Sequence, residues 1–196
     1  LLIQATQSDP QLATAWGNLA NGYFQLGKAE ETKASCYKAI ELNPTLFNSH
    51  FLLASILMGQ QKLQEAESSL RKTIELKPDF FQAHSNLGGI LKDLGKLEEA
   101  EQMTRKAIEL KPNYAEAYYN LGIILKDLNK LDESINSYQK AINVKRNYKK
   151  AIAEMGVVMT LKGDYRNGLQ KIKEGYGSII FNHITSTMKI DCSWRE

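Results

Sequence analysis

The sequence contains few of the residues that mark secreted, metal-binding or membrane-spanning proteins. Of its 196 residues only two are cysteines, Cys36 and Cys192, and they form neither a disulfide framework nor a metal-ligand spacing. No apolar run approaches the roughly 20 residues that cross a bilayer, and residues 1–9 lack the charged start and cleavage site of a signal peptide. The chain begins with Leu rather than Met, which leaves an upstream segment open. These absences predict a cytoplasmic protein with no membrane partner and no metal.

The chain also has no large excess of charge of either sign. It contains 25 Lys and Arg residues and 22 Asp and Glu residues, so the net charge is +3. Because no basic stripe is present, neither nucleic acid nor an anionic membrane surface is favoured as a partner. A content of 43% hydrophobic residues is too high for a disordered chain. We therefore expect a soluble, folded protein.

Proline is scarce too, and its four occurrences are regularly spaced. They stand at Pro10, Pro44, Pro78 and Pro112, so each gap is 34 residues (44 − 10, 78 − 44 and 112 − 78). The segments KAIELNP, KTIELKP and KAIELKP end at the last three, and KAINVKR follows in the same frame. Such a fixed period indicates a tandem repeat array. The predicted boundaries are 1–12 for the end of a truncated repeat, 13–46, 47–80, 81–114 and 115–148 for full repeats, 149–176 for a degenerate fifth, and 177–196 for a cap or tail.

Within each repeat the apolar residues have helical spacing twice. In the first half they recur at positions i, i+3, i+4 and i+7, as in Trp16, Leu19, Ala20 and Tyr23. A break at Gly-Lys, Gln-Lys, Asn-Lys or Gly-Asp follows, and then a second apolar stripe, which the next proline ends. Each repeat is therefore predicted to be an antiparallel helix pair, and the chain an all-α protein.

These residues resemble the tetratricopeptide repeat (TPR), whose 34-residue pattern runs from an aromatic residue through Leu-Gly, Tyr and Ala to a final Pro. The match covers about residues 13–175. The resemblance implies a right-handed α-solenoid, a TPR superhelix, that binds a protein or peptide along its inner wall. His50 and His84 replace the first aromatic residue, where we expect them to pack between helices rather than bind metal. Gly168 and Gly175 replace alanines, which predicts a less ordered last helix.

The resemblance places the inner wall on the first helix of each pair. Asn18, Asn86 and Asn120 are equivalent there, because 86 − 18 is two periods and 120 − 86 is one. A similar asparagine ladder holds extended peptides in the repeats of O-linked N-acetylglucosamine transferase, although Leu52 interrupts it here. The alternative is that Asn is simply a common polar choice at this position. The candidate groove residues are Asn18, Asn21, Phe51, Leu52, Met58, Asn86, Lys92, Tyr119, Asn120, Ile123 and Lys126.

Two further properties of this groove follow from its side chains. Its apolar members are expected to form an exposed patch, which is either a contact site or covered by the tail or a neighbouring molecule. Lys92 and Lys126 each precede an aspartate, one period apart. These pairs favour either a ligand of mixed charge or simple solvation of the helix ends. The apolar members are Phe51, Leu52, Met58, Tyr119 and Ile123.

The sequence shows no reaction centre. The TPR clamp that grips chaperone carboxylates requires Lys, Asn, Asn, Lys and Arg, and its cations are absent from the equivalent positions. The phosphate-loop spacing from Gly22 to Lys28 has Ala29 where Ser or Thr would hold magnesium, and a helical pattern precedes it. No catalytic triad or metal-ligand set is found. We expect no enzyme activity and no cofactor.

Residues 177–196 depart from the repeat. Alternation in Met188, Ile190, Cys192 and Trp194 favours an extended cap or hairpin, although helical spacing fits almost as well. The predicted function of the chain is that of a non-catalytic scaffold for a protein or peptide. One alternative is the substrate-recruiting region of a larger glycosyltransferase, sulfotransferase or oxygenase, suggested by the half-repeat at residues 1–10. Another is homo-oligomerisation through that half-repeat or the tail.

Overall fold

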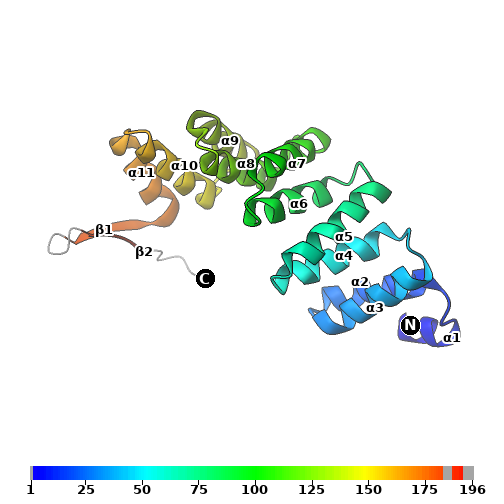
Figure 1. The fold of residues 1–196 in the computed structure, drawn as a ribbon. Helices are drawn as coiled ribbons and strands as arrows, with labels where there is room; N and C mark the ends of the chain where they lie inside the picture. Colours follow the sequence, from blue (N-terminus) through cyan, green and yellow to red (C-terminus); the bar gives the residue numbers. More distant parts are fainter. Residues whose placement is uncertain (1, 183–186, 192–196) are drawn as a thin grey trace. The chain divides into compact units, whose positions relative to one another are not determined.

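The computed structural model describes residues 2–182 and 187–191, and it is built from helices in tandem antiparallel pairs (Figure 1). The predicted all-α repeat fold is therefore confirmed. The chain divides into an N-terminal unit, Leu1–Lys96, and a C-terminal unit, Leu97–Glu196. The helices of the N-terminal unit are α1 (Leu2–Ser8), α2 (Ala13–Gln25), α3 (Ala29–Leu42), α4 (Phe47–Gly59), α5 (Leu63–Leu76) and α6 (Phe81–Asp93). Those of the C-terminal unit are α7 (Leu97–Leu110), α8 (Ala115–Asp127), α9 (Leu131–Val144), α10 (Lys149–Leu161) and α11 (Tyr165–Tyr176).

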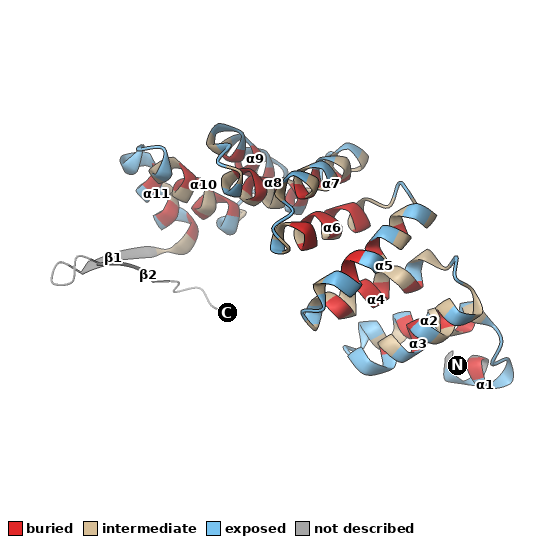
Figure 2. Ribbon diagram, viewed as in Figure 1, coloured by how far each residue is buried: buried red, intermediate tan, exposed pale blue. Residues whose placement is uncertain are grey.

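Neighbouring helices pack in chain order inside each unit. In the N-terminal unit α2 packs on α3, α3 on α4, α4 on α5 and α5 on α6, and α2 also contacts α4. In the C-terminal unit the same order runs from α7 to α11. The buried residues lie on the helix sides that face these neighbours (Figure 2). The first helices α2 and α4 therefore lie side by side in the N-terminal unit, and α8 and α10 do so in the C-terminal unit, as in a TPR inner wall.

The turns inside the pairs use the left-handed backbone that the Gly and Asn breaks indicated. Gly27, Gly95 and Gly163 have φ angles of 70°, 76° and 90°, and Gln61 and Asn129 adopt 59° at the equivalent positions. Glycine has no Cβ to clash in this region, whereas most other residues are strained there. The turn geometry is thus the same at all five positions, and only Gln61 is neither Gly nor Asn, the residues that adopt it most readily.

The first-helix aromatic position is tied to the proline that precedes it. Trp16 Nε1 donates to the Pro10 carbonyl at 2.9 Å. His50 Nε2 lies 2.9 Å from the Pro44 carbonyl, and His84 Nε2 lies 2.8 Å from the Pro78 carbonyl. A carbonyl oxygen only accepts, so each of these ring nitrogens carries the hydrogen. Each histidine is therefore held against the loop that precedes its own helix. Within the described residues no group of three or more His, Cys, Asp or Glu side chains could hold a metal ion.

The core is built from small residues facing larger ones. In the C-terminal unit Gly122 lies under the fully buried ring of Tyr138, and a Cβ added to this glycine would meet the ring at 2.6 Å. In the N-terminal unit Cys36 is fully buried, and this burial raises the pKa of its thiol to about 12. Cys36 thus packs as a small apolar residue, because its thiolate is strongly disfavoured.

The last helix is complete in the structure, although its two glycines predict a lower intrinsic helix stability. α11 spans twelve residues, and both Gly168 and Gly175 are buried. A Cβ on Gly168 would lie 2.5 Å from Thr160 Cγ2, and one on Gly175 would lie 2.5 Å from the Lys149 carbonyl oxygen. These glycines let α10 and α11 approach until backbone meets backbone. Intrinsic helix propensity, on which the prediction rested, does not include such close packing between two helices.

The described segments that follow Gly177 are extended strands. β1 (Ser178–Asn182) and β2 (Thr187–Asp191) pair in antiparallel register, with Ser178 opposite Asp191 and Asn182 opposite Thr187. Cys192 and Trp194, which contributed to the alternation in the sequence, lie outside the described residues. In the part of the chain that the structure describes, none of the helices has the length and apolar character needed to cross a membrane.

Candidate functional site

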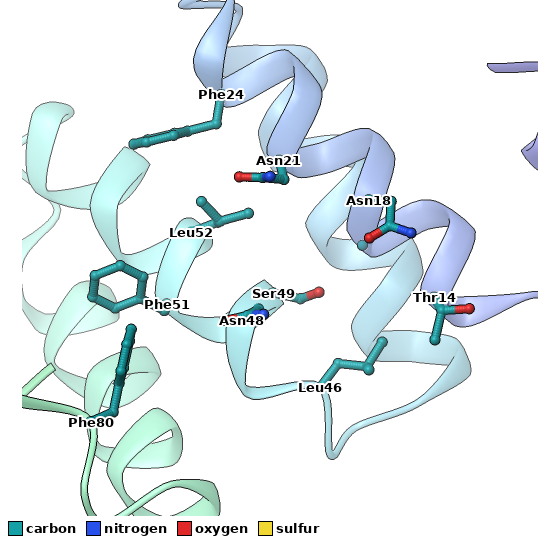
Figure 3. A pocket seen from close by; sticks show the side chains of 11 residues that line it. Thr14, Asn18, Asn21, Phe24, Leu46, Asn48, Ser49, Phe51, Leu52 and Phe80 are labelled. Atoms are coloured by element: carbon teal, nitrogen blue, oxygen red, sulfur yellow. The ribbon is translucent and has the colours of Figure 1, made fainter. Parts of the chain in front are cut away.

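The N-terminal unit contains a hollow of about 490 Å³ on the side where α2 and α4 lie next to each other (Figure 3). Its volume falls in the range of ligand-binding pockets in proteins. The lining comes from α2, from α4 and from the residues just before α4 and α6. The lining residues are Thr14, Gly17, Asn18, Asn21, Phe24, Leu46, Asn48, Ser49, Phe51, Leu52 and Phe80.

One side of the hollow is apolar and held rigid by ring contacts. The rings of Phe51 and Phe80 meet edge to face with centroids 4.9 Å apart, and Phe47 packs against Phe80 at 5.5 Å in the same manner. Lys77 Nζ lies over the Phe47 ring at 4.7 Å and near the Phe80 ring at 5.6 Å. Phe24, at the end of α2, is 40% exposed and borders the same space (Figure 3). Apolar surface left uncovered in this way gains free energy when a ligand removes it from water.

The opposite side of the hollow is polar but uncharged. Thr14, Asn18 and Asn21 extend from α2, and Asn48 lies at the start of α4; all four are exposed (Figure 3). Each asparagine amide offers one acceptor and two donors. Of the described residues that line the hollow, none carries a charge. The arrangement can therefore hydrogen-bond a neutral polar group such as a peptide unit while its other side covers an apolar group.

The expectation that Leu52 is exposed on the inner wall is wrong. Leu52 lines the hollow, but it is only 7% exposed, whereas Phe51 beside it is half-buried. Because α4 contacts α2 as well as α5, this side of α4 is covered by the neighbouring first helix. Leu52 thus belongs to the base of the hollow rather than to an exposed patch.

The remaining candidates of the N-terminal unit lie outside this hollow. Met58 and Asn86 are half-buried and are not among its lining residues. Lys92 is also half-buried, and its ammonium group lies 2.8 Å from a carboxylate oxygen of Asp93. The two charges of this pair therefore contact each other.

In the C-terminal unit the candidates form a second stretch of first-helix surface with a different chemistry. Tyr119 is half-buried, and its ring lies 5.3 Å from that of Tyr148. Burial, followed by the charge of Glu154, raises the pKa of the Tyr119 hydroxyl. Lys126 donates to Glu154 at 3.0 Å, and Tyr176 donates to the same carboxylate at 2.8 Å. Lys126 is thus paired with Glu154, which the sequence did not suggest.

Asn120 and Ile123 share this surface of α8. Both are half-buried, so each keeps part of its side chain accessible. Asn120 occupies the repeat position that Leu52 occupies two repeats earlier, since 120 − 52 = 68. The stretch is therefore more polar than the corresponding part of the N-terminal unit.

Seven lining residues are absent from the predicted groove: Thr14, Gly17, Phe24, Leu46, Asn48, Ser49 and Phe80. Leu46 and Phe80 immediately precede first helices, Ser49 is buried on α4, and Phe24 closes one end. A signal for the first two was available, because Leu12, Leu46, Phe80, Tyr114 and Tyr148 stand 34 residues apart and all are apolar or aromatic. The predicted groove contains only residues on helix faces, whereas this repeated position lies just before each first helix.

Comparison with protein families is consistent with this arrangement. Models described as tetratricopeptide repeat match residues 13–46, 47–80 and 79–147, which together span residues 13–147. The chain belongs to the tetratricopeptide repeat family. No curated protein sequence matches this TPR chain closely enough to be counted as a relative.

Several solved structures share the fold of this TPR protein. YrrB, a TPR protein with an unusual peptide-binding site, is 20% identical and has a TM-score of 0.78 over 89% of this chain and 90% of its own. MamA is 22% identical, with a TM-score of 0.76 over 83% and 89%. PilF of Pseudomonas aeruginosa is 24% identical, with a TM-score of 0.72 over 85% and 77%. At these identities the likeness concerns the fold alone.

Proposed function

We propose that this TPR protein is a non-catalytic scaffold that holds a segment of another protein in the hollow between α2 and α4. The observation that supports the proposal is the composition of this hollow, in which exposed amides on α2 face an apolar base on α4. A polypeptide has both properties, since it carries backbone donors and acceptors at every residue and side chains that differ in polarity. The similarity to YrrB, whose site binds a peptide, is compatible with this role.

In this proposal only part of the asparagine ladder contacts the ligand in the hollow. Asn18 lines the hollow together with Asn21, one helical turn further along α2. Asn86 and Asn120 are equivalent to Asn18 but half-buried, and neither lines this hollow. We assign the principal backbone contacts to Asn18 and Asn21, with Asn120 serving the first-helix surface of the C-terminal unit.

The test is capture of a protein from a lysate of the source organism by the immobilised chain. We expect Asn18→Ala with Asn21→Ala to lower capture at least about tenfold, a loss of about 1.4 kcal/mol. Because both residues are exposed, the melting temperature should stay within about 2 °C. Asn113→Ala, at an exposed turn in the C-terminal unit, is the matched control. Capture that is equal for all variants would remove the hollow from the proposal.

The alternative role, recruitment of a substrate by a larger enzyme, uses the same hollow. It differs in what the captured protein undergoes afterwards. Mass spectrometry of the captured protein from cells that contain or lack this chain separates the two roles. A modification that disappears with the chain indicates recruitment, and an unchanged protein indicates a scaffold.

A further inference from the structure

We infer that the hollow selects an uncharged, extended stretch of polypeptide that inserts one large apolar side chain, aromatic or aliphatic, against Phe51 and Phe80. The inference rests on the proposed function, because it names the ligand class for the same hollow. It goes beyond that function by excluding ligands whose recognition depends on a carboxylate, a phosphate or an ammonium group.

The first argument is charge. No Asp, Glu, Lys or Arg is found among the residues that line the hollow. Lys77 lies beside the hollow rather than in its lining, and its ammonium group lies over the Phe47 and Phe80 rings. A charged ligand group placed among the lining residues would lose part of its hydration without an ion-pair partner among them, which is unfavourable. An uncharged segment avoids this penalty.

The second argument is the apolar surface that remains uncovered. The edge-to-face contact of Phe51 with Phe80 fixes both rings, so little side-chain entropy is lost when a ligand packs on them. Phe24 is 40% exposed at the border of the hollow, and Leu52 forms its base. A large apolar side chain that reaches this position would contact rings and aliphatic groups. Aromatic side chains gain further from ring pairing.

The third argument is the spacing of the amides. Asn18 and Asn21 are three residues apart on α2, which places their Cβ atoms about 5–6 Å apart on one side of the helix. In an extended peptide, groups on the same side recur every two residues, or about 6.6 Å. The two amides can therefore meet successive backbone groups on one side of an extended ligand. Specificity then comes from the side chain on the other side, which faces the rings.

The test is selection from a random twelve-residue peptide library displayed on phage, with the full chain immobilised. For the wild type we expect peptides enriched about threefold or more in Phe, Tyr, Trp, Leu or Met and depleted in Asp, Glu, Lys and Arg. Phe24→Lys places a cation at the border of the hollow. Because Phe24 is in the last turn of α2, the helix dipole favours a lysine there.

The matched control is Leu26→Lys, which adds the same charge two residues further on. Leu26 is 72% exposed and does not line the hollow. A peptide selected on the wild type should bind Phe24→Lys at least about tenfold more weakly and Leu26→Lys equally well. A new selection on Phe24→Lys should yield peptides enriched in Asp and Glu. Circular dichroism confirms that each variant keeps its helices.

The outcomes separate the ligand class from the proposed function. The wild type could instead select charged peptides. If those peptides bind Phe24→Lys and Asn18→Ala differently from the wild type, the ligand class is overturned, but peptide binding at the hollow stands. Peptides that bind all variants equally would place binding elsewhere and overturn both. A library that yields no enrichment on the wild type would also overturn both.

Discussion

At the scale of single residues, this repeat fold depends on a balance between small and large side chains at equivalent places. Gly122 leaves room for Tyr138 in the C-terminal unit. Two periods earlier the same positions hold Ala54 and Leu70, both fully buried, where a larger first residue is matched by a smaller second one. Protein interiors are close-packed, so the space that Gly122 leaves is filled by the Tyr138 ring.

This balance predicts that Gly122→Ala destabilises the protein. The new Cβ would lie 2.6 Å from Tyr138 Cε1, and the fully buried ring has no open space to enter, so we expect a loss of about 1–3 kcal/mol. Urea unfolding followed by circular dichroism measures it. Adding Tyr138→Leu to Gly122→Ala should recover part of the loss, since it reproduces the Ala54 and Leu70 combination.

The control for that prediction is Gly89→Ala on α6. A Cβ at Gly89 would meet no atom within 4 Å, so the substitution should stabilise the protein by about 0.5–1 kcal/mol through helix propensity. If Gly122→Ala proved as stabilising as Gly89→Ala, the close contact with Tyr138 would not exist in solution.

A second residue-scale prediction concerns Gln61, which adopts φ 59° where the equivalent residues in other pairs are Gly27 and Gly95. A left-handed conformation costs a residue with a Cβ roughly 1–2 kcal/mol. Glycine avoids this cost, but the larger entropy of its unfolded chain offsets part of the gain in stability. Gln61→Gly should therefore stabilise the protein by about 0.5–1 kcal/mol, measured by thermal and urea unfolding. The reverse change, Gly95→Gln, should destabilise the protein by a similar amount. A change of stability in the same direction for both variants would contradict the argument.

At the scale of helices, successive repeats are joined by a repeated ion triad. Glu67 on α5 accepts from Arg71, one turn along the same helix, at 2.8 Å, and from Lys96, just after α6, at 2.9 Å. One period later Glu101 accepts from Arg105 and Lys130, both at 2.8 Å. The glutamates are largely covered and the cations are about half exposed. Each triad connects the second helix of one pair to the turn of the next.

The triads predict a pH-dependent contribution to stability. Burial acts to raise the pKa of Glu67, but hydrogen bonds and charges of Arg71 and Lys96 outweigh it, so the pKa is lowered on folding. A carboxyl group of this kind stabilises the fold above its unfolded pKa, and this stabilisation is lost as the pH falls through the folded value. Glu67→Gln should thus cost about 0.5–1 kcal/mol at pH 7, and this cost should shrink as the pH falls through the lowered pKa of Glu67 in the folded state.

Urea unfolding of wild type and Glu67→Gln between pH 7 and pH 2.5 measures this difference. Glu65→Gln is the control on the same helix, because Glu65 is exposed and its pair with Lys62 is long, at 3.6 Å. Its effect at pH 7 should be smaller. A Glu67→Gln loss that persists unchanged at pH 2.5 would show that the residue acts by packing rather than by charge.

The helices themselves could be predicted from the sequence, whereas parts of the candidate site could not. The 34-residue period, the Gly and Asn breaks and the prolines all report on local backbone conformation. The burial of Leu52 and the place of Phe80 in the hollow depend instead on how α4 packs on α2 and on where the segment before α6 lies. The close approach of α10 and α11 at Gly168 likewise required coordinates, because a propensity scale contains no contact.

At the scale of the whole molecule, the two units carry related but distinct inner surfaces. Phe51 and Phe80 in the N-terminal unit correspond to Tyr119 and Tyr148 in the C-terminal unit, since 119 − 51 and 148 − 80 both equal 68, or two periods. The neighbouring chemistry differs, because Lys126 and Glu154 form an ion pair beside the tyrosines. The neutral hollow is therefore a property of the N-terminal unit.

This division predicts that binding of an uncharged peptide at the hollow resides in the N-terminal unit. All residues that line the hollow lie between Thr14 and Phe80, inside Leu1–Lys96. In a repeat protein each helix pair is stabilised by its neighbours in the chain, so a fragment that keeps those neighbours should keep the hollow. We expect the fragment 1–96 to be helical by circular dichroism and to bind a selected peptide within about threefold of the full chain, by fluorescence anisotropy.

The fragment 97–196 is the counterpart in this experiment. It retains Tyr119 and Tyr148 but lacks the neutral hollow, so it should not bind the same peptide measurably. Phe24→Lys in the fragment 1–96 should weaken binding as it does in the full chain. A helical 1–96 fragment that fails to bind would mean that residues beyond Lys96 complete the site, and a fragment without helical signal would mean that the N-terminal unit depends on α7 for its stability.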